Sequence, residues 1–71
     1  MVSSEICKKV YDYLVDYISE FRTVPTHQEI AEATGVSLGS VGNATNQLHN
    51  LGYIRKEHNR NKAIQILKSY P

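Results

Sequence analysis

Small and amide side chains line one face of a helix predicted over residues 38–51, and they are well suited to specific hydrogen bonding. The face consists of Gly39, Ser40, Gly42, Asn43, Asn46 and Gln47. Because amide groups both donate and accept, Asn43, Asn46 and Gln47 are candidates for bidentate pairing with adenine N6 and N7 in a DNA major groove. The helix contains no Lys, Arg, Asp or Glu, although solvated helix faces are usually rich in Lys and Glu. A neutral face that is only solvated is the alternative interpretation.

Basic residues are concentrated in a predicted hairpin that follows this helix. Arg55, Lys56, Arg60 and Lys62 all lie in this short stretch. Together with Asn61 they are candidates for contacts with DNA phosphates, and Arg60 at the tip could enter a minor groove. The alternative is that these charges protect a sheet edge from aggregation, and the two roles are compatible.

Hydroxyl side chains at the starts of two predicted helices are further candidates for phosphate contacts. Thr26 and Glu29 have the spacing of a capping box, in which the hydroxyl and the carboxylate each accept a backbone N–H. Ser37 is the predicted cap of the next helix, and Ser40 lies in its first turn. Because helix N-termini keep other N–H groups free for anions, we expect Thr26, Ser37 and Ser40 to face the DNA backbone.

A tight turn positions the amide-bearing helix. Residues 26–34 predict a short helix that ends at Gly35, which supplies a positive φ. Val36 fills the angle between the helices, and Ser37 begins the second one. Two helices joined this way cross steeply, which leaves the outer face of the second free to enter a groove.

A longer amphipathic helix is predicted over residues 4–21, with Ser3 or Ser4 as its cap. Its apolar side chains at helical spacing are Ile6, Val10, Leu14, Tyr17, Ile18 and Phe21. The complete apolar arc is wider than one packing face needs. Either the helix is enclosed between the hairpin and the other helices, or one of its margins contacts a partner, such as a second copy. The contact would be made through Tyr11 and Val15 on one margin or through Tyr13 on the other.

The remaining segments predict a small β component. Val24 precedes Pro25 and is therefore biased toward extended backbone, so a very short strand is expected there. Two strands are predicted at residues 53–56 and 63–67, with Ile64 and Ile66 on one face. Residues 57–62 join them, with 58–61 as the turn. The entire chain is therefore predicted to be one α+β domain, mainly α with a small β-hairpin.

Charge is distributed unevenly along the chain of 71 residues, although the net charge is only +1. Residues 1–34 contain three bases and six acids, which gives −3, whereas residues 35–71 contain five bases and one acid, which gives +4. The positive half favours a polyanionic partner.

Several function classes are not supported by the sequence. Cys7 is the single cysteine, so it forms no internal disulfide, and a position in the core is expected. Cys7 and the histidines lack metal-ligand spacing, and His49 is expected to be solvated. We expect no enzyme, cofactor, small-molecule substrate or membrane contact. No signal peptide or membrane span is recognisable, which predicts a cytoplasmic protein.

Three motifs carry a resemblance to a known family. They read Pro25-Thr26-x-x-Glu29-Ile30-Ala31, Gly35-Val36-Ser37 and Leu48-x-x-Leu51-Gly52-Tyr53-Ile54. The chain resembles bacterial winged-helix regulators and is most similar, over nearly its whole length, to the N-terminal DNA-binding domain of LexA repressors. The resemblance implies a winged helix-turn-helix fold of three helices, a short strand and a two-stranded wing. Ser40, Asn43, Asn46 and Gln47 then occupy recognition-helix positions, and residues 55–62 belong to the wing.

The resemblance also leaves alternatives open. LexA-type repressors continue into a self-cleaving Ser–Lys domain that dimerises, so this sequence is either a fragment or a stand-alone regulator such as a phage-encoded one. We expect sequence-specific binding of double-stranded DNA by a repressor-like transcriptional regulator that acts as a dimer on a two-fold site. The alternative is a protein-interaction module that docks on a regulator or polymerase subunit. It would use Tyr11 and Val15, or the acidic stripe of Asp12, Asp16 and Glu20.

Overall fold

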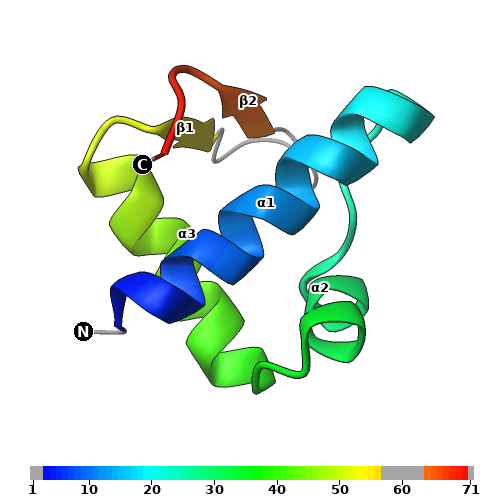
Figure 1. The fold of residues 1–71 in the computed structure, drawn as a ribbon, viewed down its shortest axis with the longest axis vertical. Coiled ribbons are helices and arrows are strands. Elements are labelled where there is room, and N and C mark those ends of the chain that lie inside the picture. Colours follow the sequence, from blue (N-terminus) through cyan, green and yellow to red (C-terminus); the bar gives the residue numbers. More distant parts are fainter. Residues whose placement is uncertain (1–2, 57–63, 71) are drawn as a thin grey trace.

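The computed structural model describes residues 3–56 and 64–70, in which three helices precede a small antiparallel sheet. The elements are α1 (Ser4–Phe21), α2 (His27–Thr34), α3 (Leu38–Asn50), β1 (Ile54–Lys56) and β2 (Ile64–Ile66). Figure 1 shows α1 lying across α3, with α2 beside the lower part of the bundle and the sheet at its opposite side. The predicted mainly α class with a small hairpin is confirmed, and the element order is that of a winged helix-turn-helix.

Short-range capping contacts define where the helices begin and end. Ser3 Oγ accepts the first-turn N–H of α1 at 3.2 Å. Thr26 Oγ1 accepts from Glu29 N at 3.1 Å and Glu29 Oε1 accepts from Thr26 N at 2.9 Å, so the predicted capping box is complete. Gly35 ends α2 at φ 75°, as expected. Arg22 ends α1 in the left-handed region at φ 59°, a role that the sequence did not indicate.

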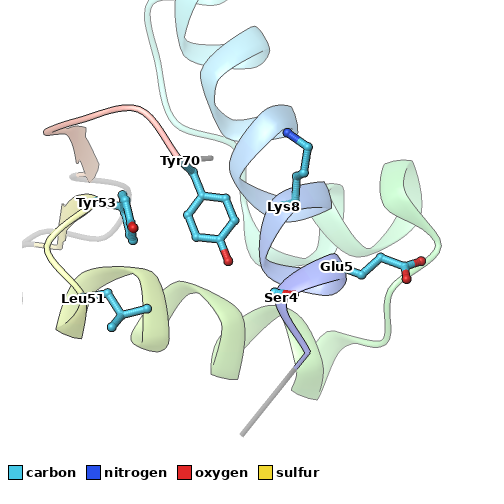
Figure 2. Close-up of a pocket in the computed structure, with 6 residues that line it drawn as sticks. All are labelled: Ser4, Glu5, Lys8, Leu51, Tyr53 and Tyr70. Carbon is cyan, nitrogen blue, oxygen red and sulfur yellow. The ribbon is translucent and has the colours of Figure 1, made fainter.

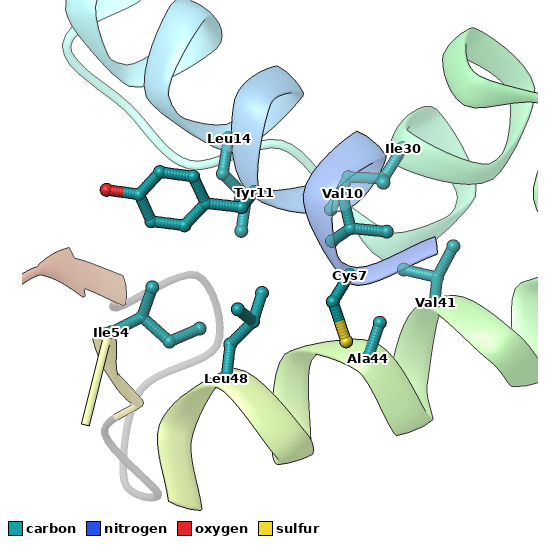
Figure 3. Packing of buried hydrophobic residues seen from close by; sticks show 9 residues of the cluster. All are labelled: Cys7, Val10, Tyr11, Leu14, Ile30, Val41, Ala44, Leu48 and Ile54. Carbon is teal, nitrogen blue, oxygen red and sulfur yellow. The ribbon is translucent and has the colours of Figure 1, made fainter. Parts of the chain in front are cut away.

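The hydrophobic core lies where α1, α2, α3 and β1 meet. Its buried members are Cys7, Val10, Tyr11, Leu14, Ile30, Val41, Ala44, Leu48 and Ile54. Figure 3 shows the α1 side chains facing those of α3, with Ile54 closing one end. The predicted core position of Cys7 is confirmed. Because burial raises the pKa of its thiol, Cys7 is poorly suited to act as a nucleophile.

The β structure is smaller than predicted. Val24 forms no strand within the described residues; it is half-buried and packs against the core. A strand needs a hydrogen-bonded neighbour, and the described ladder pairs only β1 with β2, with Arg55 opposite Gln65. β1 begins one residue later than predicted and β2 ends one residue earlier, although Tyr53 O still accepts from Leu67 N at 2.9 Å just outside the ladder.

The segment after β2 returns to α1 and covers part of it. Tyr11 is only 6% exposed, its hydroxyl donates to Lys68 O at 2.7 Å, and its ring centroid lies 5.7 Å from that of Tyr70. Val15 is half-buried against the core. The expectation that Tyr11 contacts a partner is therefore wrong, because the chain's own C-terminal segment occupies that side of the helix. On its packed side α1 contacts α2 and α3, and its buried residues are Cys7, Val10, Tyr11 and Leu14.

Candidate nucleic-acid interface

The two sides of α3 differ as its helical spacing predicts. Its buried residues are Val41, Ala44, Thr45 and Leu48. Asn43 and Asn46 are exposed, and Gln47 is half-buried at the margin of the same outer side. The three amide side chains predicted to contact bases are therefore carried by one helix, and both Asn43 and Asn46 are open to an incoming ligand.

Two glycines on α3 are not required by the packing of the protein. Among the described residues, a Cβ atom added at Gly39 or Gly42 would meet no atom within 4 Å, once the helix's own backbone is set aside. Each glycine destabilises a helix by about 1 kcal/mol relative to alanine. Packing among the described residues therefore does not require glycine at either position, and alanine there should make the helix more stable.

Hydroxyl groups at the N-termini of α2 and α3 are engaged in capping. Ser37 Oγ accepts from Ser40 N at 3.3 Å and donates to Ser40 Oγ at 2.9 Å. Thr26 accepts from the backbone of α2, as described above. Each cap satisfies one backbone N–H and leaves others in the first turn without a partner within the helix, which is the arrangement that accommodates anions.

The two bases of β1 point in different directions. Ile54 is buried, Arg55 is exposed and Lys56 is half-buried, so the strand alternates and places Arg55 on the outer face of the sheet. The structure therefore separates these two predicted phosphate-binding residues. The other three, Arg60, Asn61 and Lys62, lie outside the described residues.

Lys56 is in contact with α3. Its Nζ donates to Asn46 Oδ1 at 2.8 Å and to Thr45 Oγ1 at 3.2 Å, and its backbone N donates to His49 Nδ1 at 3.1 Å. The prediction that His49 is solvated is therefore wrong, since the ring is half-buried and bonded to β1. The sequence carried no signal for these contacts, because they join residues on different elements.

The charge of Lys56 also influences the pKa of His27 at the start of α2. Burial lowers the pKa of His27 from its ordinary value of 6.5, and the positive charge of Lys56 lowers it further. Burial likewise lowers the pKa of Lys56. Both shifts mean that extra positive charge is unfavourable here in the free protein.

We expect His27 to make the protein less stable in mild acid. Because its folded-state pKa is depressed, the unfolded chain binds more protons, so stability is complete above about pH 6.5 and falls as the pH decreases from there. Thermal unfolding of the unaltered chain and of His27→Gln, followed between about pH 7.5 and about pH 5.5, measures this contribution. The unaltered chain should lose more stability than His27→Gln, and equal losses would contradict the assignment.

An open cavity lies away from the amide face. It has a volume of about 460 Å³ and is lined by Ser4, Glu5, Lys8, Leu51, Tyr53 and Tyr70. Figure 2 shows the Tyr70 ring standing between Tyr53 and the start of α1. Tyr53 and Tyr70 meet edge to face with centroids 4.8 Å apart, so the cavity wall is part of the packing that holds the C-terminal segment.

The described residues offer neither a metal site nor a membrane-spanning helix. Within residues 3–56 and 64–70, no group of three or more His, Cys, Asp or Glu side chains could hold a metal ion. None of the helices in these ranges combines the length and apolar character needed to cross a bilayer.

Known proteins add an independent comparison. No model of a protein family matches the chain. A LexA repressor from Moorella thermoacetica is 38% identical over 63 residues, which cover 87% of this chain and 31% of that repressor. This chain is similar to LexA repressors. Those of Syntrophotalea carbinolica and Leifsonia xyli subsp. xyli are 37% and 36% identical over 83% and 87% of the chain. The chain spans a little under a third of the length of these LexA repressors: 31% for Moorella thermoacetica, 30% for Syntrophotalea carbinolica and 28% for Leifsonia xyli subsp. xyli. The resemblance predicted from the sequence is confirmed.

Proposed function

We propose that this chain binds double-stranded DNA sequence-specifically, with α3 in the major groove and the hairpin on the DNA backbone, as a repressor-like transcriptional regulator in the cytoplasm. The observation that carries the proposal is the outer side of α3. It is uncharged, and it holds exposed amides beside glycines that no described packing contact requires. Amides match the donor and acceptor pattern of base edges, and glycines allow the helix backbone to approach them. The name of the similar proteins, LexA repressor, supports the same function.

Two groups of residues have different roles in this proposal. Asn43, Asn46 and Gln47 contact bases and thereby determine the sequence that is bound. A second group contacts phosphates and positions the protein: Thr26, Ser37, Ser40, Arg55, Lys56, Arg60, Asn61 and Lys62. The described part of the chain has few bases near α3, so one copy should bind weakly. We therefore propose that two copies bind a two-fold site, through a surface that does not include Tyr11.

Gly42→Ala tests the proposal because it should change stability and DNA binding in opposite directions. Outside the backbone of α3 itself, an alanine Cβ at this helical position meets no atom of the described chain within 4 Å, so the free energy of unfolding should rise by about 0.5–1 kcal/mol. The added methyl group would hold α3 away from the bases, so affinity for duplex DNA should fall. Denaturant unfolding and fluorescence anisotropy with a labelled duplex measure the two effects. A variant that is more stable and binds DNA equally well would contradict a groove-facing α3.

A further inference from the structure

We propose that Lys56 fixes the carboxamide of Asn46 so that Asn46 presents its NH2 group to the DNA and selects guanine. The inference rests on the proposed function, because it concerns which base the outer side of α3 contacts. In it Asn46 touches the base, and Lys56, besides the phosphate contact proposed for it above, acts on base choice as a positioning residue through Asn46.

Both the backbone and the side chain of Lys56 are hydrogen-bonded to α3. Its backbone N donates to His49 Nδ1 at 3.1 Å, and its Nζ donates to Thr45 Oγ1 at 3.2 Å. Thr45 is fully buried, and its hydroxyl donates to Gly42 O at 2.9 Å, which leaves the hydroxyl oxygen to accept from the ammonium. The ammonium group therefore has a defined position next to the amide face.

This position determines which way the Asn46 amide is turned. Lys56 Nζ lies 2.8 Å from Asn46 Oδ1. An ammonium group has three donors and no acceptor, so the atom that faces it has to be the oxygen rather than the nitrogen. Asn46 is exposed, and its Nδ2 forms no hydrogen bond within residues 3–56 and 64–70. The amide NH2 is thus the group that remains for a ligand.

An amide turned in this way does not suit adenine. Adenine offers the N6 donor and the N7 acceptor, so bidentate pairing needs both the oxygen and the nitrogen of the amide. Guanine offers two acceptors, N7 and O6, which suit an NH2 group beside a positive charge. Asn46 is therefore assigned to guanine in place of the adenine expected from the sequence. Asn43 and Gln47 have no described bond to a lysine, and their expected pairing is unchanged.

Selection of bound sequences from a pool of random duplexes tests the assignment. The unaltered chain should enrich a motif with guanine at one position, and Lys56→Met should reduce the guanine-to-adenine ratio there by about tenfold without changing the other positions. Lys9→Met removes the same charge from an exposed site on α1 and should retain the original motif. A thermal melt of each variant confirms that it is folded.

Asn46→Asp identifies the position and does not depend on the folding of Lys56→Met. A carboxylate has acceptors only, so the guanine should be replaced by cytosine, whose N4 is a donor. Two results would overturn the inference and leave the proposed function intact. In the first, Lys56→Met enriches the same motif as the unaltered chain. In the second, the position changed by Asn46→Asp holds adenine in the motif of the unaltered chain. If the unaltered chain enriches no motif, both are overturned.

Discussion

Leu48→Ala should lower the free energy of unfolding by about 2–5 kcal/mol, the usual range for a fully buried leucine. Leu48 has no exposed surface and lies at the centre of the core between α1, α3 and β1. A domain of this size has a small core and a modest stability, so the loss should remove a large part of its free energy of unfolding.

Leu38→Ala is the matched control, since it removes the same atoms from the same helix. Leu38 is 55% exposed, and truncating it should change the unfolding free energy by less than about 0.5 kcal/mol. Denaturant unfolding followed by far-UV circular dichroism measures both variants. Similar losses in the two variants would contradict the described packing of α3.

Asn43→Ala should remove the preference for one base pair with little effect on folding. Asn43 is exposed, and alanine favours a helix more than asparagine does, so stability should not fall. A base contact of this kind contributes about 1–3 kcal/mol of discrimination, which corresponds to roughly 5- to 150-fold in relative affinity. Competition between the selected duplex and its single-base variants gives the measurement.

Asn50→Ala provides the comparison for this result. Asn50 is also an exposed amide on α3, but it is the last residue of the helix, beside the Leu51 cap. Its loss should leave the base preferences unchanged. The account of α3 would be wrong if both variants retained full discrimination, or if Asn50→Ala lost as much as Asn43→Ala.

Features that depend on neighbouring residues were predictable from the sequence. The capping box at Thr26 and Glu29, the left-handed Gly35 and the helical spacing of α3 each arise from interactions within one or two turns, and the structure contains all three. The same spacing predicted which side of α3 would be buried.

Features that depend on distant contacts could not be predicted in this way. The strand expected at Val24 needed a partner that the described fold does not supply. The covering of Tyr11 is another example, because its hydroxyl donates a hydrogen bond to Lys68 O, which lies 57 residues further along the chain. The bond between Lys56 and Asn46 also joins two elements, and it changes which base the amide is expected to select. Local patterns therefore indicate the elements and their faces, whereas the tertiary contacts determine what each side chain presents.

Titration of the unaltered chain with duplex DNA at several salt concentrations tests the central claim most directly. If α3 and the hairpin occupy the groove and the backbone, the logarithm of the binding constant should fall linearly with the logarithm of the salt concentration, with a slope that reports several neutralised phosphates. Affinity that does not change with salt, or no binding at low salt, would contradict the account.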